Sequence, residues 1–108
     1  MISRIWHGWT THENADAYES LLNDEIFVVI KNRMIKGFKD IQLHRRNVGD
    51  EVEFITIMRF DSIDAVREFA CDDYEACVVP PSARRVLKRY DHRSQHYEIK
   101  IFEDGTHV

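Results

Sequence analysis

The sequence predicts an α+β domain in which one antiparallel four-stranded sheet carries its helices on one face. Three observations support this. Strand-like and helix-like segments follow the order β-α-β-β-α-β, a short turn joins the two middle strands, and no repeat or linker divides the chain. Two β-α-β halves of this kind fold into the ferredoxin-like arrangement. A length of 108 residues suits one modest core, so residues 1–108 are expected to form a single domain.

The first strand is predicted over residues 2–10, which hold both tryptophans of the chain. Because side chains alternate along a strand, Trp6 and Trp9 are expected to point to opposite faces of the sheet. Thr11 or Asn14 is expected to cap the helix that follows. Apolar residues at steps of three and four predict the buried face of this helix: Tyr18, Leu21, Leu22, Ile26, Val29 and Ile30.

A hairpin is predicted after this helix, which Gly37 is expected to close. Residues 38–47 and 51–60 both alternate and flank a Val-Gly-Asp turn signal. Ile55 and Ile57 lie on one face of the second strand, so both of its faces are apolar and it is expected to be buried on both sides. The residues on its other face are Val52, Phe54, Thr56, Met58 and Phe60.

The second half of the chain predicts a helix, a break and a strand. Asp61 or Ser62 is expected to cap the helix. A Pro-Pro pair then forces a break, and Ser82 is expected to cap a last short helix that extends to Tyr90. Residues 95–102 alternate as the fourth strand. The inner stripe of the first of these helices is Ile63, Val66, Phe69 and Ala70.

Bulk composition favours a cytoplasmic protein that binds neither nucleic acid nor membrane. The net charge is −4, which argues against a nucleic-acid footprint. No stretch approaches the roughly 18–20 apolar residues of a membrane span, and no signal-peptide pattern opens the chain. Cys71 and Cys77 are six residues apart, which is no redox or zinc spacing, so both are expected to be buried as small apolar residues.

A sheet with helices on one face leaves its other face bare. Here that second face carries Ile and Trp rather than Lys and Glu. An exposed apolar face of this kind is normally covered, and the chain has no further segment to cover it. Self-association of two sheets into a homodimer is therefore expected.

At this level of detail the chain resembles the antibiotic biosynthesis monooxygenase-like proteins of the dimeric α/β-barrel superfamily. The resemblance spans residues 2–101. It is carried by three stretches: "ISRIWHGWTTHENADAYESLL", "IQLHRRNVGDEVEFITIMRFDSIDAVREFA" and "DDYEACVVPPSARRVLKRYDHRSQHYEI". The middle stretch, with its hairpin, buried strand, Asp-Ser helix cap and aromatic in the second helix, is the most telling.

The resemblance implies that two ferredoxin-like protomers pack sheet against sheet into a barrel. Each protomer would keep a small cavity between its sheet and its helices. Some such proteins oxidise aromatic polyketides with molecular oxygen and no metal or flavin, others degrade haem, and others have no established activity. The same resemblance puts Arg4 and Trp6 on the cavity side of the first strand and Ile5, His7 and Trp9 on the side where the sheets pack.

Haem degradation of the known type is not expected. The haem-degrading proteins carry an Asn on the first strand, a Trp in the second helix and a ligating His shortly after it. The matching places here hold Trp6, Phe69 and residues 77–79, and no histidine occurs between His44 and His92.

Seven side chains are candidates for a site, and no spacing singles one out. Histidine suits proton transfer near neutral pH, and flat aromatic rings suit the walls of an apolar pocket. Each candidate also fits a structural role, since cores and interfaces absorb most aromatics. The predicted catalytic residues are His44, Tyr74 and His96, and the predicted pocket residues are Arg4, Trp6, Arg59 and Phe69.

No metal and no cofactor are predicted. His92 and His96 are four residues apart, but that segment is expected to be a turn that enters a strand, where this spacing does not bring two side chains together. The expected function is a cofactor-independent monooxygenase that acts on a small aromatic or quinone-type substrate. The alternative is a non-catalytic dimer that binds a small apolar metabolite or acts in stress.

Overall fold

The computed structural model describes residues 1–76 and 79–105. Cys77 and residues 106–108 therefore lie outside the described residues. The elements are β1 (Ile2–Thr11), α1 (Ala15–Leu21), the π-helical turn η1 (Leu22–Ile26), α2 (Phe27–Asn32), β2 (Phe38–Val48), β3 (Glu51–Phe60), α3 (Ile63–Ala70), α4 (Pro81–Arg84), β4 (Arg89–Tyr90) and β5 (Gln95–Glu98).

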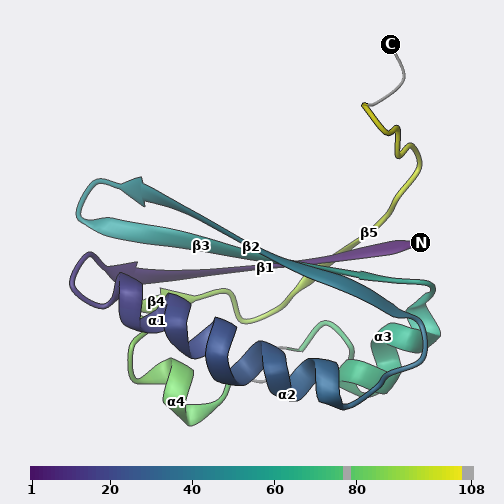
Figure 1. Cartoon of the computed structure of the whole chain (residues 1–108), viewed down its shortest axis with the longest axis horizontal. Helices are drawn as coiled ribbons and strands as arrows, with labels where there is room; N and C mark the ends of the chain where they lie inside the picture. The colour runs from purple at the N-terminus through teal and green to yellow at the C-terminus, as the bar shows by residue number, and fades with distance from the viewer. Residues whose placement is uncertain (77–78, 106–108) are drawn as a thin grey trace.

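The predicted α+β, ferredoxin-like arrangement is confirmed. The strands lie in the order β2-β3-β1-β4, β5 also pairs with β1, and every pairing is antiparallel. The helices all lie on one face of the sheet, and the C-terminal segment extends away on the other side (Figure 1). Among the described residues, no helix has the length and apolar content needed to cross a bilayer.

The fourth strand differs from the prediction of one strand over residues 95–102. It is split into β4, which pairs with Gly8 and Trp9, and β5, which pairs with residues 2–5. Between them the chain leaves the ladder because Ser94 donates its N–H to the carbonyl of Glu75 instead, at 2.7 Å. Beyond β5 the chain runs off the edge of the sheet, and Phe102 is 73% exposed.

The long first helix is confirmed, but its register changes in the middle. The N–H of Phe27 bonds to the carbonyl of Leu22, five residues back, which makes one π-helical turn. Each residue of an α-helix advances by about 100° around the axis, so this extra residue rotates the following segment. Phe27 is therefore buried, with 8% of its surface exposed, and Val29 is 63% exposed. The prediction of Val29 in the buried face was wrong for this reason.

Helix ends follow the predicted chemistry in part. The Ser62 hydroxyl accepts the N–H of Ala65 at 3.2 Å at the start of α3, as predicted. Asn14 stands at the N-cap position of α1 but makes no side-chain cap bond, and its own N–H donates to the Thr11 hydroxyl at 3.2 Å. Gly37 does not close the first helix, which ends at Asn32. It adopts a positive φ of 91°, and a Cβ there would lie 2.8 Å from Cβ of Ala65, so only glycine lets this loop pass α3.

The last helix is shorter than predicted. It begins at Pro81, which supplies the fixed φ and missing N–H suited to the first helical turn, and not after a Ser82 cap. It ends at Arg84, and Tyr90 belongs to β4. Cys71 is exposed and adopts a φ of 90° after α3, so the expectation that it is buried was wrong.

The core lies on the face of the sheet that the helices cover, hereafter the covered face. Tyr18 of α1 packs edge-on against Phe54 of β3, with ring centroids 4.8 Å apart. Phe60 packs between Phe38 and Phe69, at 5.6 Å from each. The predicted inward face of β3 is confirmed, since these residues are all buried: Val52, Phe54, Thr56, Met58 and Phe60.

The opposite face, hereafter the uncovered face, has an apolar centre and a charged border. Ile55 and Ile57 of β3 stay partly exposed there, so β3 is not fully buried on both sides within one chain. Ile5, His7 and Trp9 lie on the same face because their register partners are Ile57, Ile55 and Glu53. Ion pairs border this centre: Arg46 with Glu53, Arg89 with Glu51, and Arg59 with Asp40.

Candidate functional site

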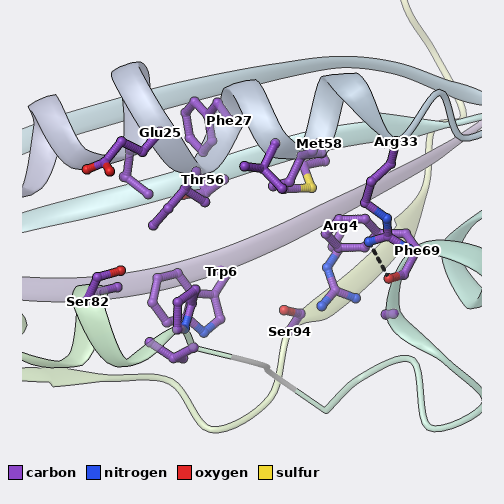
Figure 2. A pocket seen from close by; sticks show the side chains of 18 of the residues that line it. Arg4, Trp6, Glu25, Phe27, Arg33, Thr56, Met58, Phe69, Ser82 and Ser94 are labelled. Atoms are coloured by element: carbon purple, nitrogen blue, oxygen red, sulfur yellow. Dashed lines mark hydrogen bonds between the residues drawn. The ribbon is translucent and has the colours of Figure 1, made fainter.

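A cavity of about 540 Å³ lies between the covered face and the helices. This volume falls within the range of small-molecule pockets. Side chains from β1, β3, the long helix, α3 and α4 line it, and Figure 2 shows the labelled ones converging from the sheet and the helices. Most of this lining is apolar, including Trp6, Phe27, Met58 and Phe69.

Trp6 forms one wall, and its orientation is fixed at both ends. The indole Nε1–H donates to the carbonyl of Asp91 at 2.8 Å, in the gap between β4 and β5. The ring lies back over Gly8, where an added Cβ would come within 3.2 Å of the indole. A side chain at this position would therefore require the indole or the neighbouring Leu87 to shift by a few tenths of an ångström. The stretch Trp-His-Gly-Trp therefore positions a single flat wall, and its second tryptophan faces the other way.

The π-turn builds the roof of the cavity. Leu22 and Ile26 line the cavity on one side of the turn, and Phe27, Ile30 and Arg33 line it on the other. Leu22, Ile26 and Arg33 share one face at ordinary α-helical spacing, whereas Phe27 would point about 100° away from Ile26 in an uninterrupted helix. The extra residue thus adds Phe27 to the strip of helix that faces the cavity.

One end of the cavity is basic. Arg4 of β1 is only 7% exposed, and its guanidinium donates to the main-chain carbonyl of Tyr74 and, at 2.9 Å, to Nε2 of His96. The guanidinium groups of Arg4 and Arg33 both stack on Phe69, at 5.3 and 5.4 Å from the ring centroid. Cation–π contacts of this kind hold a charged group against an apolar wall.

His96 is neutral at physiological pH. A guanidinium can only donate, so Nε2 of His96 must accept and its proton must sit on Nδ1. Burial, and then the positive charge of Arg4, lowers the pKa of His96 to about 4. Within the described part of the chain, Nδ1 is buried and has no hydrogen-bond partner. The ring is held edge-on to Tyr74, with centroids 5.0 Å apart.

Polar groups that the sequence interpretation missed also reach the cavity. Tyr18 was assigned only to the helix core, yet it lines the cavity, and burial raises the pKa of its phenol so that it stays protonated. The hydroxyl-bearing Thr56 and Ser94 are buried and line the cavity too. For Tyr18 the sequence did offer a signal, because it is the one tyrosine in a helical stripe of otherwise aliphatic residues. Nothing in the sequence marked Ser94, because it lies within the unpredicted break between β4 and β5.

Comparison with solved structures identifies the fold. A proposed antibiotic biosynthesis monooxygenase from Bacillus cereus aligns over 96% of this chain and 95% of its own, with a TM-score of 0.63 and 12% identity. SnoaB, a cofactor-independent oxygenase from Streptomyces nogalater, aligns over 97% of both chains, with a TM-score of 0.55 and 16% identity. The chain has the antibiotic biosynthesis monooxygenase-like (ABM-like) fold.

The ABM-like fold also occurs in a protein with different chemistry. The haem-degrading protein MhuD from Mycobacterium tuberculosis aligns over 96% of this chain and 100% of its own, with a TM-score of 0.57 and 16% identity. By sequence, no family model and no curated protein matches this chain. The likeness therefore lies in the three-dimensional arrangement, and the side chains of the cavity have to be interpreted on their own chemistry.

Within the ABM-like fold, the predicted site residues divide into three groups. Arg4, Trp6 and Phe69 line the cavity. Tyr74 and His96 lie directly behind Arg4, in contact with it and with each other, but are not part of the lining. His44 and Arg59 lie elsewhere, on the uncovered face.

The alternation of the strands explains why these two residues lie elsewhere. On β2 it is Leu43 that pairs with the cavity-lining Thr56, so the next residue, His44, points to the opposite face and bonds to Gln42 at 2.9 Å. Arg59 follows Met58 and likewise points away. It hydrogen-bonds to Asp40, whose pKa it lowers.

Metal-ligating side chains do not gather in the residues that the structure describes: no group of three or more His, Cys, Asp or Glu side chains is placed to hold an ion. The polar groups that reach the cavity are hydroxyls, two guanidinium groups and the carboxylate of Glu25. This set can orient a ligand, donate hydrogen bonds and stabilise negative charge.

Proposed function

We propose that this protein is a cofactor-independent monooxygenase that oxidises a small aromatic or quinone-type substrate in the cavity. The observation that carries the proposal is the cavity itself, with its aromatic walls and its few polar groups, Arg4 and Tyr18 among them. Solved structures with the same fold include an oxygenase described as cofactor-independent, which supports this choice of chemistry.

In the proposed reaction, the substrate supplies the electrons and the protein supplies position and charge. A ring methylene of an anthrone-type substrate loses two hydrogen atoms, one oxygen atom of O2 becomes the ketone oxygen, and the other leaves as water. Deprotonation of the substrate comes first, with the proton passing to solvent water, and Arg4 would stabilise the resulting anion. Tyr18 would donate a hydrogen bond to a substrate oxygen, since its phenol stays protonated.

His96 and Tyr74 are assigned to the support of Arg4. The imidazole accepts from the guanidinium and the carbonyl of Tyr74 accepts from the same nitrogen, so the two together fix the direction of the charge. The low pKa of His96 keeps the imidazole neutral and able to accept. Both are therefore positioning residues in this proposal.

The proposed active form is a homodimer in which two uncovered faces pack together. The support is the apolar centre of that face, where Ile5, Ile55 and Ile57 lie side by side on neighbouring strands. Contiguous apolar surface of this kind typically marks an interaction site. A closed symmetric dimer would bury the same patch on both protomers.

Oxygen uptake tests the proposed function. Purified protein with a panel of hydroquinones and anthrones is expected to consume oxygen above the uncatalysed rate. Met58→Trp would narrow the cavity and reduce that excess, whereas Val28→Trp, an enlargement on the exposed side of the long helix, would not. If an apolar ligand binds and no substrate is oxidised, the catalytic proposal is wrong and the non-catalytic binding alternative replaces it.

A further inference from the structure

The strand pairing along β1 is interrupted opposite Trp6 and His7. On that side, β4 pairs with residues 8–9 and β5 pairs with residues 2–5, so neither strand includes a partner for the two residues between them. Asp91 is the first residue of the segment that crosses this break. Because no continuous ladder holds Asp91, its position depends on individual contacts.

Asp91 contacts β1 from both faces of the sheet. Its main-chain carbonyl accepts the indole N–H of Trp6 at 2.8 Å, on the covered face. One of its carboxylate oxygens lies 3.3 Å from Nδ1 of His7, on the uncovered face. Its own N–H donates to the carbonyl of His7 at 2.9 Å, at the edge of the sheet. All three branches at the Cα of Asp91 are therefore tied to two neighbouring residues of β1.

The bond to the indole is the one directional contact that the Trp6 ring can make. The Nε1–H is the only hydrogen-bonding group of a tryptophan side chain. Trp6 lines the cavity, as Figure 2 shows, and its other neighbours pack against it without fixing a direction, such as Tyr90 at 6.0 Å between ring centroids. The orientation of this wall therefore depends on the direction of the Asp91 carbonyl.

The contact between His7 and Asp91 is open to the outside. Their side chains are 32% and 28% exposed on the uncovered face. Trp6 and His7 are adjacent in β1 and point to opposite faces, so a residue that touches both side chains joins the two faces. Whatever covers this part of the uncovered face would meet the His7–Asp91 contact directly.

We propose that Asp91 and His7 are positioning residues for the cavity: their contact on the uncovered face sets the Asp91 carbonyl, and that carbonyl holds the Trp6 wall in place for the ligand. The inference goes beyond the proposed function, because it concerns the shape of the cavity and not the reaction within it. It makes ligand binding on one face of the sheet depend on side chains of the other.

The fluorescence of Trp6 and the affinity of the cavity test the inference. Trp9→Phe leaves Trp6 as the one tryptophan of the chain. In this background, Asp91→Ala and His7→Ala are each expected to raise the acrylamide quenching constant of Trp6. Each should also weaken the binding of 2-naphthalenemethanol, a neutral aromatic probe, by about two- to tenfold in titration calorimetry, which corresponds to one hydrogen bond.

Combined variants show whether the two residues act as a pair. The double variant His7→Ala/Asp91→Ala should be no worse than either single variant, because both remove the same contact. Asp91→Asn keeps a polar side chain of the same size and should keep most of the wild-type quenching and affinity. Trp6→Phe removes the indole N–H, so in that variant Asp91→Ala should no longer change the affinity.

Asp40→Ala is the matched control. It removes a carboxylate that pairs with Arg59 on the uncovered face, in a contact that does not involve β1. Quenching and affinity should both stay at the wild-type values. Circular dichroism checks the fold of every variant, and all are compared at a concentration where sedimentation velocity gives the same assembly state.

The outcomes separate this inference from the proposed function. Unchanged quenching and affinity in both alanine variants would overturn it, and so would losses that simply add in the double variant. If Asp91→Ala does not fold, His7→Ala tests the same contact. If the probe binds to none of these proteins, the proposed cavity function is contradicted, and the quenching of Trp6 alone decides the positioning role.

Discussion

The two faces of the sheet use the same strands for opposite purposes. On the covered face, β1 and β3 contribute Trp6, Phe54 and Met58 to a closed core and a cavity. On the uncovered face, the neighbouring residues of the same strands form an isoleucine centre with a border of ion pairs. Strand alternation alone separates the two surfaces, so a single residue step along β3 moves from the cavity side of the sheet to the uncovered face.

The difference shows that an apolar residue in a strand need not be buried within its own chain. Which face of the strand it lies on decides this. Phe54 and Ile55 are adjacent and both apolar, yet Phe54 is fully buried against Tyr18 and Ile55 stays partly exposed. The first is needed for the fold of one chain. The second acquires a role only when something covers it.

Truncation of these two neighbours should produce the largest contrast. Phe54→Ala is expected to reduce the free energy of unfolding by about 3–5 kcal/mol, because it leaves a cavity beside Tyr18. Ile55→Ala is expected to reduce it by about 1 kcal/mol or less at protein concentrations low enough to give single chains. Urea unfolding monitored by circular dichroism measures both. Equal losses in dilute solution would mean that the two faces are equally buried within one chain.

A charge at the uncovered face should act on assembly and leave the fold intact. Trp9 lies beneath the guanidinium of Arg89, with Cζ 3.9 Å from the ring centroid, and is in register with Glu53. Trp9→Glu would place two carboxylates side by side in the proposed interface, which should weaken dimerisation by about 100-fold or more. Sedimentation velocity at micromolar concentration measures the effect, and Trp9→Phe should remain dimeric. A monomeric wild-type protein would contradict the proposed dimer.

The smallest expected effect is a pH dependence that belongs to the covered face. His96 takes up a proton near pH 4 in the folded chain and near pH 6.5 when unfolded. Between these values the unfolded state binds more protons, so stability is full above about pH 6.5 and is lost as the pH falls toward 4. By pH 5, the loss is expected to reach about 1 kcal/mol after allowance for solvent screening.

Two histidine variants isolate this effect. His96→Gln should remove the loss of stability between pH 6.5 and 5, and His44→Gln, on the uncovered face, should keep it. The measurement is the urea midpoint across that pH range. A wild-type midpoint that does not change over this range would mean that His96 is as accessible to protons in the folded chain as in the unfolded one.

The fold was predictable because strand alternation and capping are local properties. The inward face of β3 and the cap at Ser62 could be read directly from residue order. Positions that depend on a contact with a distant part of the chain could not be predicted in this way. Gly37 is fixed by its approach to Ala65, and the split of the fourth strand depends on the bond from Ser94 to Glu75.

The cavity was predictable only where strand alternation defines it. Arg4 and Trp6 were placed on the cavity side of β1. Arg33 was missed, although it follows Leu22 and Ile26 at α-helical spacing, because a charged residue at the end of a helix is usually solvent-exposed. Residue type alone suggested His44 and His96 equally as site residues. Strand register distinguishes them: His96 pairs with Arg4, which lines the cavity, whereas His44 pairs with Ile55 on the uncovered face.

The π-turn between Leu22 and Phe27 lets one helix serve the core and the cavity at the same time. An α-helix absorbs a one-residue insertion as such a turn, so the segments on either side keep their own faces. Here the segment before the turn keeps Tyr18 on Phe54, and the segment after it places Phe27 and Ile30 over the cavity. Loss of one residue at this place would change the cavity lining at the turn, while both helical segments and the sheet stay unchanged.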